Sequence, residues 1–144
     1  MPGAHGIRRA LEGDAPELAR LLTPLGYPRS EEDLRAVWDA WEADGNFALV
    51  AEGSDGLIGV VTLHSMVVLH RPRPVGRITS LFVDTPARGA GLGRALMEAA
   101  ENALRERGCG LVEVTSHRRR TDAHTFYERF GYERTSYRFA RELR

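Results

Sequence analysis

Lysine is absent from this sequence: all twenty of its lysine-plus-arginine positions are arginine. Without lysine the chain has no Schiff-base residue and no lysine general base. A Walker-type loop is excluded too, because it needs a lysine on the nucleotide phosphates. Several large classes of enzyme are therefore excluded before any motif is considered.

The chain also has little cysteine, no net charge and no long apolar run. The one cysteine, Cys109, cannot form an internal disulfide bond. Twenty acidic residues balance the twenty basic ones, so the chain lacks the positive excess of a nucleic-acid-binding protein. No stretch is apolar enough for a membrane span or the core of a signal peptide. We therefore expect a cytoplasmic protein that binds neither nucleic acid nor membrane, and no metal site is predicted.

What the chain does have is the length and patterning of one domain. Its 144 residues, 42% of them hydrophobic, suffice for a single core, and we expect one domain over residues 1–144. Helical spacing predicts helices that begin after Asp14 and Ser30, and two more over 92–107 and 122–130. Alternation predicts strands over 5–11, 47–52, 57–69, 77–84, 111–115 and 132–143. This order of elements predicts an α/β fold.

Local signals mark the ends of these helices. Asp14 followed by Glu17 is a capping-box pattern. Thr121 is the expected cap of the last helix, and Gly131 is expected to end it.

One segment carries most of the chemistry: residues 83–94, Val-Asp-Thr-Pro-Ala-Arg-Gly-Ala-Gly-Leu-Gly-Arg. It follows a predicted strand and opens a predicted helix. Glycine lets successive backbone N–H groups turn toward one point, because it has no Cβ and accepts positive φ. The helix start adds unpaired N–H groups and the positive end of the helix dipole. With Arg88 and Arg94 nearby, the segment predicts a phosphate or pyrophosphate site.

Other types of glycine-rich segment fit less well. A G-x-G-x-x-G fingerprint that begins at Gly89 would need glycine at Arg94, and one that begins at Gly91 would need it at Leu96. A nucleotide-binding oxidoreductase is therefore disfavoured. A plain connecting turn is the remaining alternative, but each glycine adds unfolded-state entropy that a simple connection does not need.

The pattern Arg88-x-x-Gly91-x-Gly93 resembles the Arg/Gln-x-x-Gly-x-Gly/Ala motif of the GNAT N-acetyltransferase superfamily. The preceding Leu81-Phe82-Val83 is similar to the fourth strand of that family. A later segment, Ala123-x-x-Phe126-Tyr127-x-x-x-Gly131-Tyr132, resembles its Ala-x-x-Phe-Tyr-x-x-x-Gly-Phe motif. The element order agrees as well, so the resemblance covers essentially the whole chain.

The resemblance implies a GNAT-like fold, in which helices flank a mixed, mostly antiparallel central sheet and splayed central strands form the cofactor cleft. It implies acetyl-CoA as cosubstrate and direct transfer of the acetyl group to a primary amine of a small molecule or peptide. Dimers are common in the family, so a homodimer is compatible with the resemblance. The residues that it places at the cofactor are Leu81, Phe82, Val83, Arg88, Gly89, Ala90, Gly91, Leu92, Gly93, Arg94 and Arg120.

Two positions depart from the family pattern. The asparagine that commonly precedes the later motif by three residues is Arg120 here, which either reaches a phosphate or loses the contact. The strand glutamate that many members use as general base is missing, since that stretch reads Ile-Thr-Ser-Leu over 78–81. The base is therefore unassigned, and the candidates are His64, His117 and His124, with Glu52 acting through water as a weaker alternative.

The chemistry also needs an acid and an oxyanion donor. The resemblance puts the Tyr127 hydroxyl at the thioester sulfur, which predicts that Tyr127 protonates the leaving thiolate. The alternative is that Tyr127 is a core residue. Backbone N–H groups of residues 81–83 are candidates for stabilising the carbonyl oxygen. We expect Cys109 to be a small buried residue rather than a nucleophile.

Three other features have two interpretations each. The run Arg118-Arg119-Arg120 either contacts cofactor phosphates or is a solvated turn. The acidic residues between 30 and 44 either attract a cationic amine or form a solvent-facing helix surface. Trp38 and Trp41 are expected in the core rather than in a substrate wall.

An N-acetyltransferase is the predicted function. The alternative is a non-catalytic acyl-CoA-binding module, which the missing strand glutamate favours and the retained Tyr127 opposes.

Overall fold

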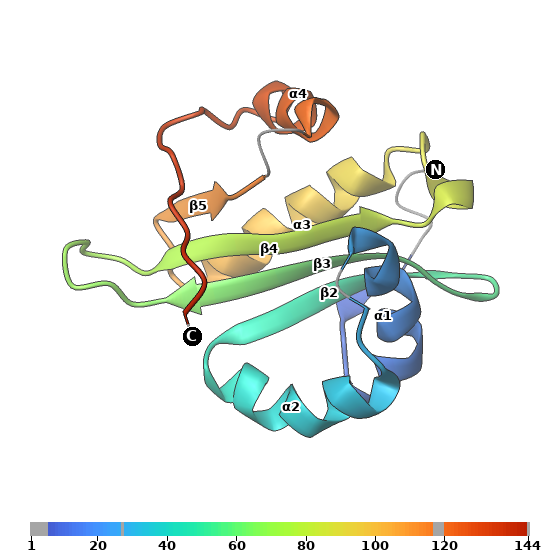
Figure 1. Cartoon of the computed structure of the whole chain (residues 1–144). Helices are drawn as coiled ribbons and strands as arrows, with labels where there is room; N and C mark the ends of the chain where they lie inside the picture. The colour runs from blue at the N-terminus through green and yellow to red at the C-terminus, as the bar shows by residue number, and fades with distance from the viewer. Residues whose placement is uncertain (1–5, 27, 117–119, 144) are drawn as a thin grey trace. The chain divides into compact units, whose positions relative to one another are not determined.

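The computed structural model describes residues 6–26, 28–116 and 120–143, and Figure 1 shows its elements. The chain forms two compact units, Met1–Glu113 and Val114–Arg144. No helix within the described ranges is long and apolar enough to span a bilayer.

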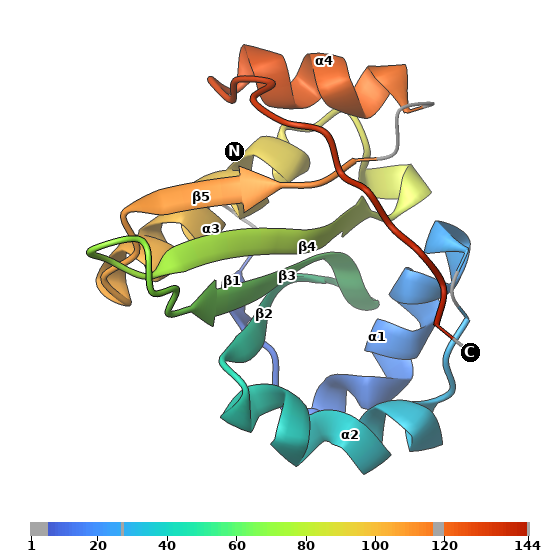
Figure 2. The same cartoon turned by 60° about the vertical axis from the view of Figure 1, so that its left-hand side comes forward.

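A five-stranded sheet has the spatial order β1-β2-β3-β4-β5, which is also the order along the chain. Its strands are β1 (Ile7–Arg9), β2 (Asn46–Gly53), β3 (Gly56–Met66), β4 (Val75–Val83) and β5 (Leu111–Val114). The first four pair antiparallel, and β5 lies parallel to β4 (Figure 2). The mixed, mostly antiparallel sheet predicted from the sequence is confirmed.

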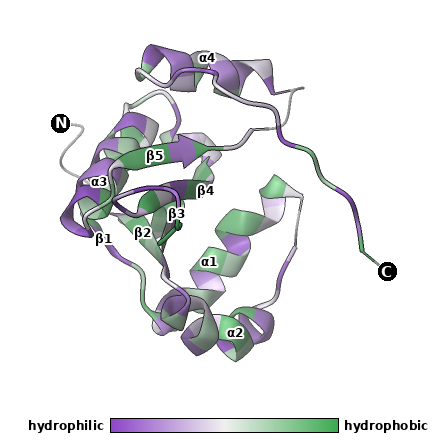
Figure 3. Ribbon diagram, turned by 90° about the vertical axis from the view of Figure 1, so that its left-hand side faces the viewer, coloured by the Kyte–Doolittle hydropathy of each residue, from purple (hydrophilic) through white to green (hydrophobic). Residues whose placement is uncertain are grey.

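Helices of the first unit cover both faces of this sheet. Helices α1 (Ala15–Leu22) and α2 (Glu31–Ala43) pack on one face, and α3 (Leu92–Glu106) lies on the other (Figure 2). Hydrophobic and hydrophilic residues alternate around α1 (Figure 3), which buries Ala15, Leu18 and Leu21 against the sheet. Short 3₁₀ turns occupy Glu12–Asp14, Thr23–Leu25 and Thr85–Ala87.

The helix starts show one correct prediction and one wrong one. Ser30 caps α2 by accepting a hydrogen bond from the Asp33 backbone N–H at 3.0 Å. The capping box at Asp14 is wrong, because that carboxylate accepts bonds from the Leu11 N–H and the Arg8 guanidinium instead. The hydrogen bonds from Arg8 hold the pKa of Asp14 below its ordinary value. The bonds to Leu11 and Arg8 have replaced the predicted cap of α1.

Two strand glycines let α3 pack closely against the sheet. An added Cβ at Gly59 of β3 would lie 2.9 Å from the Leu96 side chain. One at Gly76 of β4 would lie 2.7 Å from a methyl carbon of Leu104. Both leucines are fully buried, so these contacts fix the distance between α3 and the sheet near each end of the helix. The glycine-rich segment at the start of α3 is therefore anchored by packing.

Gly76→Ala is expected to lower the free energy of unfolding by about 1–3 kcal/mol, because the new methyl group overpacks a buried site. Gly13→Ala is the control, since an added Cβ there meets no atom within 4 Å. Urea denaturation of the two variants measures the difference. Equal stability of both variants would show that α3 has room to move.

In the second unit, α4 (Thr121–Arg129) starts after Arg120, which is its N-cap but makes no side-chain capping bond. The prediction that Thr121 is the cap is thus wrong by one residue. Gly131 follows the helix end with φ +101°, as predicted for a terminating glycine.

The expected terminal strand over 132–143 is absent from the structure, and these described residues form no regular element. Their alternating residues Tyr137, Phe139 and Leu143 are exposed. An alternating pattern becomes a strand only where a partner strand accepts its hydrogen bonds.

Candidate active site

The glycine-rich segment forms an exposed turn between β4 and α3. Residues 88–91 are exposed, and Gly89 and Gly91 have φ of +86° and +80°. Gly91 is the N-cap of α3 and offers no side chain to the helix N–H groups. No side chain among the described residues caps the first-turn amides of α3, which leaves them available to a ligand.

Arginine side chains flank this turn in different ways. The Arg88 Nε–H donates to the Val83 carbonyl oxygen at 2.9 Å, and its guanidinium lies 5.4 Å from the centre of the Phe82 ring. No carboxylate in the described part of the chain pairs with Arg88. Arg94 pairs with Glu98 one turn along α3, with 3.3 Å between Nε and Oε1. Arg88 is the better-placed positive charge for a bound anion.

The turn has the chemistry that phosphate groups require. An added Cβ at Gly89 would meet no protein atom within 4 Å, so a ligand can approach the backbone there. The Leu92 side chain is buried, with 2% exposed, so Leu92 can offer a ligand only its backbone. Uncapped amides, a helix N-terminus and a guanidinium that has no carboxylate partner among the described residues together fit a pyrophosphate.

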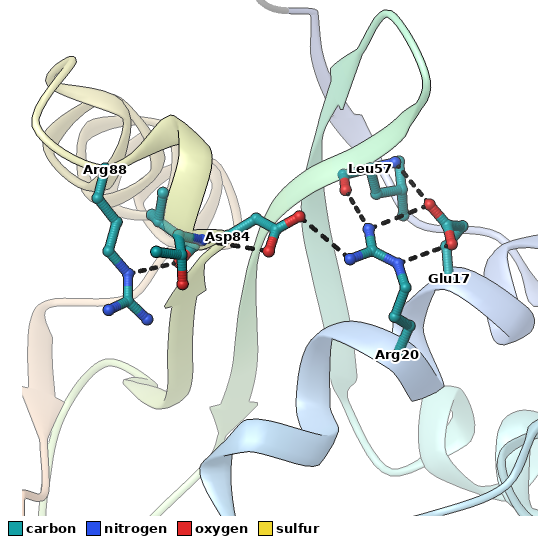
Figure 4. Close-up of polar contacts among 7 residues, drawn as sticks. Glu17, Arg20, Leu57, Asp84 and Arg88 are labelled. Carbon is teal, nitrogen blue, oxygen red and sulfur yellow. Dashed lines mark hydrogen bonds and ion pairs between the residues drawn. The ribbon is translucent and has the colours of Figure 1, made fainter.

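Arg20 of α1 ties the start of this turn to the rest of the unit (Figure 4). Its guanidinium donates to the Leu57 carbonyl oxygen at 2.7 Å and to Asp84 Oδ2 at 3.1 Å. The other Asp84 oxygen accepts the Thr85 backbone N–H at 3.1 Å. Arg20 also donates to Glu17 and so lowers the pKa of that carboxyl group. Sequence analysis missed this residue, whose partners Leu57 and Asp84 lie 37 and 64 positions away.

Arg20→Gln is expected to raise the KM for the ligand of the turn by about twofold to tenfold, the effect of roughly 1 kcal/mol. Turnover should change little, because Arg20 bonds the turn only at Asp84, before its glycines. The side chain is 46% exposed, so the loss of stability should stay below about 1 kcal/mol. Arg35→Gln, which breaks surface pairs with Glu31 and Glu12, is the control. An unchanged KM in Arg20→Gln would remove the positioning role.

A β-bulge in β4 brings three hydroxyl groups together. Thr62 of β3 pairs with Ser80, but the next residue, Leu63, pairs with Ile78, so Thr79 is an extra residue in β4. The Thr62 hydroxyl lies 2.6 Å from that of Thr79 and also contacts the Ser80 hydroxyl. A bulge redirects side chains, which explains why two consecutive residues face the same partner. We call Thr62, Thr79 and Ser80 the hydroxyl cluster. Two of its members, Thr79 and Ser80, immediately precede the Leu81–Val83 stretch of β4.

This hydroxyl cluster lines a cavity of about 190 Å³ between α1, α2 and the sheet. Leucines of α1 and α2, together with Trp38 and Trp41, form much of the remaining wall. No charged side chain from the described residues lines it. The prediction that the tryptophans belong to the core is confirmed for Trp38, which is 7% exposed, and Trp41 packs against the same core cluster. Both also form the cavity wall.

Tyr127 lies on α4 in the second unit, within a group of aromatic rings. Its ring centre is 5.4 Å from that of Phe126 and 6.1 Å from that of Tyr132. Burial raises the pKa of the Tyr127 hydroxyl, and the positive charge of Arg120 opposes that rise. A hydroxyl with a raised pKa keeps its proton at neutral pH, as a proton donor must.

The geometry of the turn agrees with a comparison against known families. The model of the acetyltransferase (GNAT) family matches residues 15–132, which span both units. The chain belongs to this GNAT family.

Individual relatives support the assignment over nearly the whole chain. The aminoalkylphosphonate N-acetyltransferase of Salmonella typhimurium is 32% identical over 142 residues, which cover 95% of this chain and 90% of that protein. The aminoglycoside N(6')-acetyltransferase type 1 of Stenotrophomonas maltophilia is 27% identical over 136 residues, covering 92% and 88%. The crystal structure of an acetyltransferase from Trypanosoma brucei superimposes with a TM-score of 0.84 at 28% identity, covering 96% of this chain and 99% of that one.

Membership in the GNAT family confirms three predictions made from the sequence: the family, the acetyltransferase activity and acetyl-CoA as the acetyl donor. It also fits the glycine turn, whose open amides suit the pyrophosphate of acetyl-CoA.

Candidate bases of this GNAT protein lie in different surroundings. His64 Nε2–H donates to the Asp44 carbonyl oxygen at 3.0 Å, so its ring lies at the C-terminal end of α2, which favours a structural role. Glu52 pairs with Arg8 near the β1 edge of the sheet, two strands away from β4. His124 lies on α4 in the second unit. His117 lies outside the described residues, as do Arg118 and Arg119.

Several acidic residues of the α2 segment have partners within the protein. Asp33 closes the capping box with Ser30, Glu31 pairs with Arg35, and Glu42 pairs with Arg9. These contacts favour the interpretation as a solvent-facing helix surface. Cys109 is buried, with its sulfur 3.4 Å from the Ser65 hydroxyl, as expected for a small structural residue.

Proposed function

We propose that this chain transfers the acetyl group of acetyl-CoA directly to the primary amine of a small molecule or peptide. One observation carries the proposal: β4 has a hydroxyl-lined cavity beside its bulge and leads at its end into an open glycine turn. Acceptor and donor sites would thus meet along a single strand. The relatives that act on aminoalkylphosphonates and aminoglycosides support an amine acceptor.

The backbone of the turn, from Arg88 to Arg94, would hold the pyrophosphate of acetyl-CoA. Amide hydrogens at the start of α3 have no side-chain cap among the described residues, and the Arg88 guanidinium adds positive charge. When bound, acetyl-CoA supplies a thioester carbonyl that an amine can attack. In the second unit, Arg120 takes the place of the usual asparagine as a further phosphate contact.

The residues of the chain then have three tasks. Backbone N–H groups of Leu81–Val83 stabilise the negative charge on the carbonyl oxygen. The hydroxyl cluster orients the amine, which must be neutral to attack and releases its proton to a base or to water. Tyr127 donates its proton to the sulfur as the C–S bond breaks and the C–N bond forms. The products are an acetylated amine and free CoA thiol.

A thiol-release assay tests this proposal. Purified protein, acetyl-CoA and a panel of primary amines should give thiol release that depends on the amine and matches the amount of amide formed. Binding of acetyl-CoA without release for any amine would instead support the non-catalytic acyl-CoA-binding alternative. Sedimentation of the same preparation would show whether the protein forms the homodimer that is common in the family. The cytoplasmic location stays a prediction.

A further inference from the structure

The cavity beside the β4 bulge is apolar apart from the hydroxyl cluster, and this character restricts what it can bind. Leu18, Leu22 and Leu34 form one part of its wall, and the rings of Trp38 and Trp41, whose centres are 4.9 Å apart, form another. Its exposed lining residues, Val37 and Thr79, mark where it reaches solvent. The cavity is therefore an apolar chamber with its hydroxyl cluster on the sheet side.

We propose that this chamber holds the body of the acceptor, and that the acceptor is a primary amine on a short aromatic or branched aliphatic body. The inference rests on the proposed function, because it assigns the chamber to the amine substrate. It excludes acceptors whose body carries several charges.

The volume of the chamber suits a single ring with a short linker. An apolar protein cavity of about 150 Å³ stays dry and binds benzene. The chamber has about 190 Å³ and comparable walls, so a phenyl group with a one- or two-carbon arm fills it. A phenyl group bound there removes apolar surface from water and makes van der Waals contacts with the side chains of the wall.

The uncharged lining of the chamber disfavours other classes of amine. A phosphonate or a second ammonium group inside it would lose its hydration without meeting an opposite charge, because no charged side chain of the described residues lines the chamber. Burial of an unpaired ion is expensive, so such amines are disfavoured. This chain should therefore differ in acceptor from its relatives named for aminoalkylphosphonates and aminoglycosides.

The hydroxyl cluster binds and positions the amine nitrogen. Three neutral hydroxyls can accept amine N–H groups without stabilising the ammonium form as a carboxylate would. Thr79 and Ser80 immediately precede the Leu81–Val83 stretch, so a nitrogen held there lies next to the proposed oxyanion donors. The apolar body and the amine thus occupy the two ends of the chamber.

Tryptophan fluorescence reports on the chamber without requiring turnover. The chain has two tryptophans, and both line the cavity. Titration with 2-phenylethylamine should change the emission and give a Kd about tenfold or more below those for 2-aminoethylphosphonate and kanamycin, since charge burial opposes both. The order of kcat/KM for acetylation should be the same.

Variants test whether the chamber is the site. Ala48→Leu extends a buried side chain into the cavity and should abolish the fluorescence change while keeping or raising the melting temperature, as cavity filling does. Ala36→Leu, on the exposed side of α2, is the matched control and should bind normally. Val37→Arg alters a residue that is 46% exposed, so it should fold. It should weaken 2-phenylethylamine binding and strengthen 2-aminoethylphosphonate binding.

The outcomes separate the two proposals. Tighter binding or faster acetylation of 2-aminoethylphosphonate or kanamycin by the wild-type protein would overturn the apolar acceptor. Normal 2-phenylethylamine binding by a folded Ala48→Leu variant would overturn the chamber as its site. If no amine is acetylated while 2-phenylethylamine still binds in the chamber, the proposed function fails and the ligand assignment holds.

Discussion

Tyr127→Phe is expected to lower turnover by roughly 10²–10⁴-fold, the usual contribution of a general acid. The ring and its contacts with Phe126 and Tyr132 stay, and only the hydroxyl is lost. The affinity for acetyl-CoA should hardly change, because the proton is needed only as the C–S bond breaks. The loss should therefore appear equally in kcat and in kcat/KM.

A purely structural role for Tyr127 gives a different result. Loss of a buried hydroxyl would then lower the melting temperature, with near-normal turnover in the folded fraction. Tyr132→Phe is the control, because it removes a hydroxyl from a neighbouring ring of the same aromatic group. Melting temperature and kcat measured on one preparation decide between the two roles. A near-wild-type kcat in Tyr127→Phe would remove the residue from the mechanism.

Gly91→Val is expected to abolish the stabilisation that acetyl-CoA confers. At a concentration of 100 Kd a ligand stabilises its protein by about 2.7 kcal/mol. Valine at φ +80° strains the backbone and places a branched side chain at the start of α3, where the pyrophosphate must approach the amides. The melting temperature with and without acetyl-CoA measures the loss.

Gly108→Val separates backbone strain from loss of the site. Gly108 follows the other end of α3 with φ +84°, and an added Cβ there meets no atom within 4 Å. Both variants should lose similar stability without ligand, of the order of 1–3 kcal/mol. The Gly108 variant alone should keep the acetyl-CoA shift. A normal shift in Gly91→Val would contradict the assignment of the turn.

Much of the fold could be predicted because its signals are local. The Ser30 cap, the apolar spacing along α3 and the terminating Gly131 each act within a few residues of the chain. The two sequence motifs that resemble those of the GNAT family identified the correct family, as the match of the family model over residues 15–132 shows. The wrong prediction at Asp14 arose where another element competes, since Arg8 of β1 binds the carboxylate of Asp14.

The glycine turn and the chamber differ in how well they could be predicted from the sequence. The turn at Gly89 and Gly91 is predictable from the sequence, because glycine is the residue type that readily adopts a positive φ. The chamber is not, because its walls come from α1, α2 and three strands that meet only in the folded chain. The sequence placed the tryptophans in an apolar interior, and only packing shows that this interior contains a cavity.

By itself, the sequence determined the family, the acetyl donor and the position of the glycine turn between β4 and α3. The tertiary structure decided the bulge at Thr79, the hydroxyl cluster and the anchoring of the turn by Arg20. The physical reason is the range of the interactions. Caps, glycine conformations and helical periodicity depend on neighbouring residues, whereas strand register, cavity shape and ion pairs across 64 positions exist only once the chain has folded.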